Sequence, residues 1–251
     1  MNISVLNIAF NQYGAISHIH PTLLEINGQY FLTDTGYENT LSQLRTALHE
    51  KSIDIINLTG VIISHDDIDH LGALYDIKKM NPLLQVYCSK IEEPSVTGKI
   101  EAERLVQAKQ LLQQLPEEQQ AWGKDFVALQ KSIQRISDVD HVVQENDLIL
   151  GDIRVIATPG HTRGHISLYI EASKTLIAND AVVAESNGEL NIANPEFTLD
   201  LPAAIRSVQK IRELDIQTLI CFHGGIVTDH IRQKLDQLIQ RYNNEQHDRT
   251  R

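Results

Sequence analysis

Short apolar runs rich in β-branched residues recur along this chain, and a polar turn follows each of them. The clearest runs occupy residues 60–64, 153–158, 174–179 and 218–222. A short apolar run that is bounded by turn residues is typical of a buried strand. The pattern therefore predicts several short buried strands along the chain.

Residues 99–136 have the pattern of helices, with Glu, Gln, Lys and Ala between regularly spaced apolar positions. The apolar face of the first helix consists of Leu105, Ala108, Leu111, Leu112 and Leu115. A second helix is expected to have Pro116 at its first position, and its apolar face consists of Trp122, Phe126, Leu129 and Ile133. We therefore expect a helical hairpin near 99–136. A helix is also expected at 201–214, and a frayed tail at 241–251.

The chain has 251 residues, enough to bury a full core, and we expect a single domain over residues 1–251. Its formal net charge of −11 and the absence of a basic run argue against nucleic-acid binding. No apolar run is long enough to span a membrane, and the N-terminus does not resemble a signal peptide. Cys88 and Cys221 lie in apolar runs and are expected to be free thiols, which favours a cytoplasmic location.

The first predicted strand leads directly into a cluster of metal-binding side chains. Residues 64–71 read Ser-His-Asp-Asp-Ile-Asp-His-Leu and place His65, Asp67, Asp69 and His70 close together, before a predicted helix. Imidazole nitrogens and carboxylate oxygens at this spacing can surround one or two divalent cations. The alternative for the cluster alone is a solvated acidic turn with two incidental histidines.

Further donors follow the other predicted strands. The run at 153–158 leads to Pro-Gly and then His161, the run at 174–179 leads to Asp180, and the run at 218–222 leads to His223. The carboxyl ends of strands are where open sheets place their ligands. Because the same arrangement occurs four times, a metal centre is favoured over four unrelated polar turns.

This pattern resembles the signature of the metallo-β-lactamase superfamily, in which His-x-His-x-Asp-His is followed by a His after Pro-Gly, a bridging Asp and a last His. The matching positions are His65, Asp67, Asp69, His70, His161, Asp180 and His223. Residues 30–36, Tyr-Phe-Leu-Thr-Asp-Thr-Gly, resemble an early strand of the family. The resemblance implies an α+β fold, an αββα sandwich of two β-sheets flanked by helices, with a site for two divalent metal ions along one edge.

Roles follow from this resemblance and from the spacing of the donors. We expect His65, Asp67 and His161 to hold the first metal ion, and Asp69, His70 and His223 to hold the second, with Asp180 as the bridge. His165 is expected to hold a ligand or Asp34 by a hydrogen bond, and Asp34 is expected to support the ligands or to be a structural carboxylate rather than to bind metal. A plain packing role for His165 stays open.

One position departs from the family pattern, because Asp67 stands where most hydrolases of the family have His. A carboxylate can replace an imidazole as a ligand. Two zinc ions are expected, and the harder, more anionic site makes Mn²⁺ or Fe²⁺ possible. The alternative is that Asp67 does not bind metal and only one ion binds well. Diiron relatives carry an acidic residue at this position, which leaves a redox enzyme that reduces oxygen or nitric oxide as another possibility.

The leading expectation is a metal-dependent hydrolase of a small ester-like substrate, such as a lactone or a thioester. Asp69 is the expected catalytic residue, which would orient the attacking hydroxide and pass its proton to the leaving group. Lactone-cleaving relatives usually have a Tyr where this chain has Val183, which weakens a specific lactonase assignment. The helical hairpin would form a lid or wall of the pocket or a homodimer contact, unless it only packs on the sheet. A metal-bound sensor without turnover is the remaining alternative.

Overall fold

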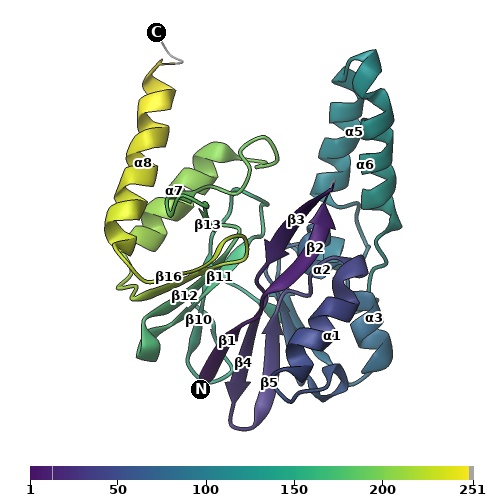
Figure 1. The fold of residues 1–251 in the computed structure, drawn as a ribbon, viewed down its shortest axis with the longest axis vertical. Helices are drawn as coiled ribbons and strands as arrows, with labels where there is room; N and C mark the ends of the chain where they lie inside the picture. The colour runs from purple at the N-terminus through teal and green to yellow at the C-terminus, as the bar shows by residue number, and fades with distance from the viewer. Residues whose placement is uncertain (13, 249–251) are drawn as a thin grey trace.

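The computed structural model describes residues 1–12 and 14–248, and in them two sheets lie face to face between layers of helices (Figure 1). The first sheet has the order β1 (Asn2–Val5), β4 (Thr22–Ile26), β5 (Gln29–Thr33), β6 (Gly60–Ile63), β7 (Gln85–Ser89), β8 (His141–Val143). The second has the order β16 (Gly225–Val227), β15 (Thr218–Cys221), β12 (Thr175–Asn179), β11 (Ile166–Ile170), β10 (Ile153–Ala157), β9 (Leu148–Ile149). The predicted αββα sandwich is confirmed.

Helices and two hairpins complete the described chain. The helices are α1 (Leu41–His49), α2 (Ile68–Leu71), α3 (Leu74–Met80), α4 (Glu93–Val96), α5 (Glu103–Gln114), α6 (Gln120–Ser132), α7 (Leu201–Arg212) and α8 (Ile231–Asp248). The short 3₁₀ helices are η1 (Glu38–Thr40), η2 (Ile55–Asn57), η3 (Glu117–Gln119) and η4 (Glu171–Ser173). Two small hairpins pair β2 (Ile8–Gln12) with β3 (Ala15–Ile19), and β13 (Val183–Ala184) with β14 (Leu190–Asn191).

The alternation of side chains along each strand builds three apolar layers. On β6, Val61 and Ile63 pack in a cluster that also contains residues of α1 and α3, whereas Ile62 packs in the cluster between the sheets. On β12, Leu176 packs in the cluster that contains residues of α7 and α8, and Ile177 faces the first sheet. Successive residues of a strand point to opposite faces, so strands buried on both faces are apolar throughout. The predicted continuous apolar runs have this physical origin.

Parallel pairing puts the important strand ends at one edge. In the first sheet β5, β6 and β7 run parallel to one another, and in the second sheet β12 runs parallel to β15. The residues that follow these strands therefore emerge on the same side of the sandwich. This edge is where the predicted donor residues lie.

The predicted hairpin forms as α5 and α6, which project together from the rest of the chain (Figure 1). The prediction for its second helix was wrong in two respects. Pro116 precedes the 3₁₀ turn η3 and is not the first residue of α6. In addition, Trp122 is 39% and Leu129 46% exposed, while α6 packs through Gly123, where a Cβ would lie 2.6 Å from Leu115. Phe126 packs against the apolar cluster of Leu105, Ala108 and Val127, whereas Trp122 remains partly exposed.

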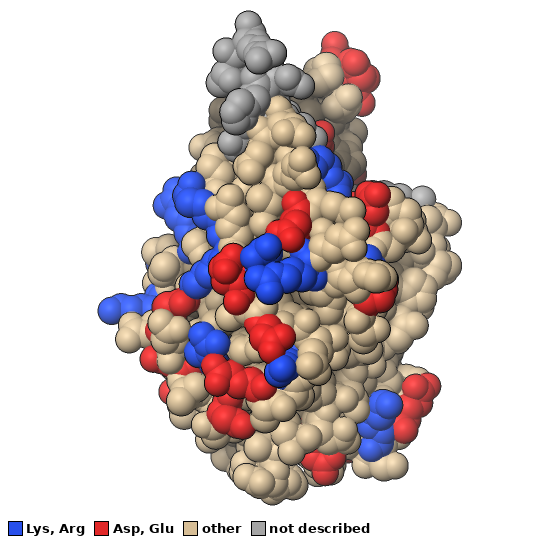
Figure 2. Space-filling model, turned by 90° about the vertical axis from the view of Figure 1, so that its left-hand side faces the viewer, with Lys and Arg blue, Asp and Glu red and all other residues tan. Residues whose placement is uncertain are grey.

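Charges of both signs lie side by side on the surface of the described chain. Figure 2 shows Lys and Arg interspersed with Asp and Glu on the side of the molecule that carries α8, where Arg212 pairs with Asp236 at 2.7 Å. Cys88 and Cys221 are buried free thiols, as predicted. Among the described helices, none is long and apolar enough to cross a membrane. Helix α8 continues to Asp248, so the predicted frayed tail is a helix to that point, and residues 249–251 lie outside the described chain.

Candidate metal centre

The seven predicted donor residues come together at the edge of the sandwich. Four of them follow strands directly or after a short turn, namely His65 after β6, His161 after β10, Asp180 after β12 and His223 after β15. The other three, Asp67, Asp69 and His70, lie at the start of α2 or within it. The sequence predicted a helix after these donors, but α2 already begins at Ile68, and its residues Asp69 and His70 lie against His223 and Asp180 of the second sheet.

Asp69, His70 and His223 form one compact group of donor atoms, which we call the Asp69 group. The Oδ2 atom of Asp69 lies 3.1 Å from Nε2 of His223 and 3.6 Å from Nε2 of His70. The Oδ2 atom of Asp180 lies 3.5 Å from each of these nitrogens. Donors bound tetrahedrally at the usual 2.0–2.1 Å from zinc are about 3.3–3.4 Å apart. The distances between these imidazole nitrogens and carboxylate oxygens are therefore close to the spacing that a tetrahedral cation requires.

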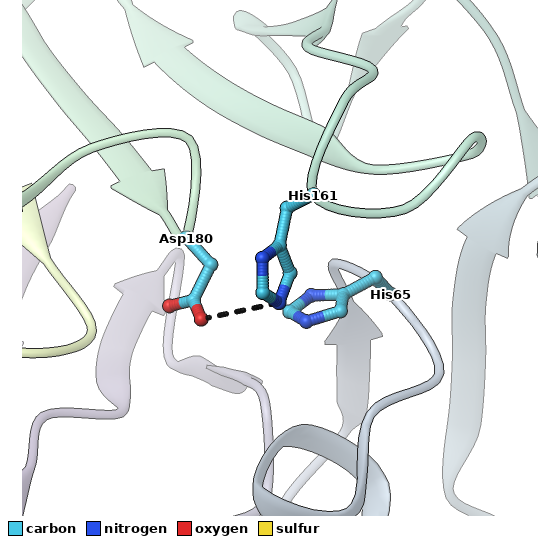
Figure 3. A group of neighbouring side chains, drawn as sticks. All are labelled: His65, His161 and Asp180. Carbon is cyan, nitrogen blue, oxygen red and sulfur yellow. Dashed lines mark ion pairs between the residues drawn. The ribbon is translucent and has the colours of Figure 1, made fainter. Parts of the chain in front are cut away.

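His65, His161 and Asp180 form the other group, which we call the His65 group. Figure 3 shows the three side chains pointing toward one another from separate loops, with Nε2 of His161 3.7 Å from Oδ2 of Asp180. The same Asp180 oxygen is close to both groups, so it is in the position of a bridge. The assignment of these donors to two metal ions stays a prediction.

Asp67 lies beside the His65 group but is paired with an arginine. Its Oδ2 atom is 2.9 Å from Nε2 of His161 and 3.5 Å from Nε2 of His65. The same oxygen accepts a hydrogen bond of 2.6 Å from Nη2 of Arg104, which belongs to α5. Although burial alone would raise it, the Arg104 charge holds the pKa of Asp67 well below its ordinary value. Sequence reasoning missed Arg104, because an arginine on an amphipathic helix is ordinarily a surface residue.

Buried hydrogen bonds orient the imidazoles toward the centre. Nδ1 of His70 donates to Oδ2 of Asp34 at 2.8 Å, and Nδ1 of His65 bonds the Ser64 hydroxyl at 2.9 Å. The Nε2 atoms of both histidines are fully buried and have no hydrogen-bond partner among the described residues. A carboxylate that accepts from one ring nitrogen leaves the other free to bind metal. The placement of Asp34 agrees with its expected orienting role.

His165 acts on Asp180 through the backbone. Its Nε2 atom accepts the backbone N–H of Asp180 at 3.1 Å, and its Nδ1 atom bonds Thr158 at 2.8 Å. Both His165 and Asp180 are buried. Of the two roles left open for His165, the structure favours that of a residue that positions a neighbouring donor.

The charges within the Asp69 group shift the acid–base behaviour of its members. Burial opposes protonation of an imidazole, but the charges of Asp180 and Asp69 outweigh it and raise the pKa of His223 to about 10. Asp69, Asp180 and Asp34 likewise raise the pKa of His70, again against burial. Despite burial, His223 and His70 hold the pKa of Asp180 well below its usual range. Without a cation, protons on the imidazoles balance these carboxylates, and metal binding displaces such protons.

Glu92 is a second residue that sequence reasoning missed. Its carboxyl group accepts hydrogen bonds from the Thr162 hydroxyl at 2.6 Å, from the Gly164 N–H at 2.9 Å and from the Asp66 N–H at 3.1 Å. It therefore ties the loop that carries His161 to the loop that carries Asp67. Burial and the charge of Asp66 raise the pKa of Glu92 to about 8. No sequence signal separates Glu92 from the neighbouring Glu93.

The donor groups open into a pocket of about 730 Å³. One wall is aromatic, because the rings of Trp122 and Phe126 stack at 5.5 Å and Phe197 lies 5.6 Å from Phe126. The helical hairpin thus supplies a pocket wall, which was one of its expected roles. His18 and Val183 also line the pocket. The floor is polar and the wall is apolar, an arrangement typical of small-molecule sites.

Comparison with known proteins agrees with this geometry. A family model described as the metallo-beta-lactamase superfamily matches residues 17–223. A probable metallo-hydrolase of Bacillus subtilis (strain 168), YflN, is 26% identical over 255 residues, which covers 96% of this chain and 89% of that protein. A hydroxyacylglutathione hydrolase of Mesorhizobium japonicum is 38% identical over 93 residues, or 36% of this chain and 34% of that protein.

Solved structures share the fold. A metallo-beta-lactamase family protein from Thermus thermophilus superimposes with a TM-score of 0.74 at 18% identity, covering 96% of this chain and 79% of that one. An archaeal metallo-beta-lactamase superfamily protein from Sulfolobus tokodaii gives a TM-score of 0.64 at 18% identity, covering 96% and 85%. At such identities the likeness concerns the fold alone.

Proposed function

The chain belongs to the metallo-beta-lactamase superfamily, and from this premise we propose that it hydrolyses a small ester-like substrate, a thioester or a lactone, at the Asp69 group. It is a metallo-hydrolase of that superfamily, whose members generally bind divalent metal ions. The proposal adds the ligands, the catalytic residue and the class of substrate.

The observation that carries the proposal is the set of buried donor atoms at the base of the pocket. Nε2 of His70 is fully buried without a hydrogen-bond partner, and it lies 3.5–3.6 Å from carboxylate oxygens of Asp180 and Asp69. A buried polar atom without a partner costs free energy unless a ligand satisfies it. A divalent cation satisfies all of these donors together, and zinc accepts both imidazole and carboxylate ligands. We assign Asp69, His70, His223 and Asp180 to such an ion.

The His65 group is a second cluster of donor atoms, with the Arg104 guanidinium beside it. It offers His65, His161 and the shared Asp180, with Asp67 beside them. Nε2 of His65 is buried and without a hydrogen-bond partner, like that of His70. Its donor chemistry therefore also suits a cation, although Arg104 stands next to it.

A bound divalent ion supplies a Lewis acid and makes hydroxide available from water at neutral pH. The chain's own residues supply the remaining steps. Asp69 is the proposed catalytic residue, because its carboxylate lines the pocket and can accept a proton from the nucleophile and deliver it to the leaving group. Asp34 fixes the tautomer of His70, and His165 holds the backbone of Asp180. These contacts keep the donors in place before substrate arrives.

The pocket favours an acyl substrate with an apolar part. Stacked Trp122 and Phe126 form an apolar wall beside the polar floor, and this wall can bury an acyl chain or a ring. Two hydroxyacylglutathione hydrolases that match segments of this chain support a thioester, although those segments cover only 34% and 39% of the two relatives. Val183 lines the pocket at the position where lactone-cleaving relatives usually have Tyr, which gives the thioester priority over the lactone.

The test is a hydrolysis panel with metal-loaded protein. Thioesters, lactones and phosphodiesters are offered to the wild type, to Asp180→Asn and to the control Asp200→Asn, which changes a helix cap whose side chain bonds the N–H of Ala203. We expect thioester or lactone turnover by the wild type and the control, and a loss of about 100-fold or more in Asp180→Asn, the scale of a lost catalytic electrostatic contact. Turnover of phosphodiesters alone, or equal turnover by Asp180→Asn, refutes the proposal.

A further inference from the structure

Arg104 places a buried positive charge inside the candidate metal centre. It belongs to α5 of the helical hairpin, and only 3% of it is exposed. Its Nε donates to Oδ1 of Asp67 at 2.9 Å, and its Nη2 donates to Oδ2 at 2.6 Å. A two-pronged guanidinium–carboxylate pair of this kind is strong and geometrically specific. Both oxygens of Asp67 therefore already have a cationic partner.

The same guanidinium also engages His161. Nη2 of Arg104 lies 3.2 Å from Nε2 of His161, the nitrogen that a metal ion in the His65 group requires. One side chain is thus in contact with two prospective ligands of that group, Asp67 and His161. A metal ion that binds both must displace Arg104 from them or share their lone pairs with it.

Arg104 is held in this position from its other side. Its Nη1 donates to Oε1 of Gln107 at 2.5 Å and to the backbone carbonyl of Phe197. Its guanidinium also lies over the Phe197 ring, 5.7 Å from the centroid. Because these partners surround the group, withdrawing it leaves several polar atoms without partners in a buried place.

The Asp69 group has no such competitor. The cationic or imidazole partners recorded for Asp69 are His70 and His223, and no arginine or lysine is within ion-pair distance of Asp69 or Asp180 among the described residues. In the Asp69 group a divalent cation therefore meets two carboxylates whose partners are imidazoles, and metal binding displaces the protons of those imidazoles. In the His65 group it meets a carboxylate that a guanidinium already neutralises, together with the repulsion of that guanidinium.

We propose that Arg104 keeps the His65 group from binding metal tightly, so that the chain holds one firmly bound divalent ion, in the Asp69 group. The guanidinium takes over the neutralisation of Asp67 that a second ion would otherwise provide. This inference rests on the proposed ligand assignment, but it makes no assumption about the substrate. It also accounts for Asp67 itself, because a carboxylate at that position gives the guanidinium its partner.

The test counts metal ions and does not depend on catalysis. Wild type, Arg104→Met and the control Arg154→Met are freed of metal, titrated with Zn²⁺ against a chromophoric chelator, and analysed for metal after desalting. Arg154 pairs with Glu171 at 2.9 Å on η4, and neither residue lines the pocket. We expect one tightly bound zinc in the wild type and in the control, and two in Arg104→Met. The second ion should bind at least about 100-fold more tightly in Arg104→Met than in the wild type, because a repelling charge is gone and Asp67 is freed.

Arg104→Met leaves the Asp67 carboxylate buried without its partner, so this variant could fail to fold. A second variant therefore tests the same proposal. Arg104→Met/Asp67→His removes both charges and offers an imidazole in place of the carboxylate. We expect it to hold two ions. Two tightly bound ions in the wild type, none in the wild type, or a single ion in both folded variants would each overturn the proposal. Hydrolysis plays no part in these outcomes, so a chain with one ion and no esterase activity contradicts the proposed function alone.

Discussion

Asp34→Asn is the most informative single substitution, because it changes the hydrogen bond that orients the proposed ligand His70 and leaves His70 itself in place. The Asp34 carboxylate is fully buried, and it accepts the Ser64 N–H at 2.8 Å, the Ser64 hydroxyl at 2.7 Å and Nδ1–H of His70 at 2.8 Å. The backbone N–H of Ser64 can only donate, so the Asn oxygen has to face it. The Asn amide nitrogen then faces His70.

That orientation reverses the hydrogen bond to His70. An amide nitrogen donates, so Nδ1 of His70 has to accept, and its proton moves to Nε2, the atom that faces the Asp69 group. The backbone itself is not perturbed, because Asp34 has a φ of 57° and Asn tolerates this left-handed conformation. The variant is therefore expected to fold and to present the wrong tautomer of one ligand.

Two independent arguments give the expected loss of metal affinity in Asp34→Asn. Removing a hydrogen bond to a charged group costs about 1.5–3 kcal/mol, and about 1.4 kcal/mol corresponds to tenfold in affinity. This gives a weakening of metal binding by roughly 10- to 150-fold. Loss of a residue that orients a metal-bound histidine typically weakens binding about 10- to 100-fold, which agrees.

The assay is zinc competition against a chromophoric chelator, with folding checked by circular dichroism. Asp200→Asn is the matched control, because Asp200 caps α7 through the N–H of Ala203 and Asn caps a helix equally well. The control should bind zinc like the wild type. An Asp34→Asn protein that is folded and binds zinc with unchanged affinity would refute the reasoning about the tautomer.

Three further predictions follow from the same structure. Because the pKa of His223 is about 10 without metal, zinc binding at pH 7 should release at least one proton. The affinity for zinc should then rise by about tenfold per pH unit for each proton released. Calorimetry in two buffers of different ionisation enthalpy measures the number of protons released, and a value of zero contradicts the prediction. The folded pKa of Glu92 is about 8 against an ordinary 4.5, so the folded state keeps a proton that the unfolded chain loses, and stability falls as pH rises between those values. Between about pH 5.5 and 7.5, the free energy of unfolding of the metal-free Glu92→Gln variant should therefore rise by about 2–3 kcal/mol relative to that of the wild type, as measured by urea unfolding. A difference in unfolding free energy that does not change with pH would contradict the raised pKa of Glu92. Trp122→Ala should raise KM for long-chain acyl substrates about tenfold, with kcat and the KM for short-chain substrates nearly unchanged. An equal rise in KM for both chain lengths would show that Trp122 does not bind the acyl chain.

Much of the fold and the positions of the donors could be predicted from the sequence. Runs such as residues 60–64 are apolar throughout because both faces of the strand are buried, and such runs are easily recognised. His65, His161, Asp180 and His223 each follow a strand, and the sandwich brings these ends to one edge. Local pattern and topology were sufficient for this part of the site.

The pair of Asp67 with Arg104 could not be predicted in this way. The two residues are 37 positions apart, and Arg104 lies on a helix whose periodicity only marks it as polar. An unexplained carboxylate at a ligand position was the available signal, because a buried charge requires a partner. Glu92 was missed for a similar reason, since its role depends on two loops that meet only in the folded chain. The exposure of Trp122 and Leu129 could not be predicted, because the helical spacing groups them with Phe126 and Ile133, which do pack in apolar clusters.

The central claim is that a divalent ion in the Asp69 group is required for hydrolysis. The most direct measurement adds zinc stepwise to metal-free wild type and follows bound zinc and thioester or lactone turnover in the same samples. The account predicts no turnover without metal and a rise in proportion to the first tightly bound equivalent. Turnover that persists after complete removal of metal would contradict it.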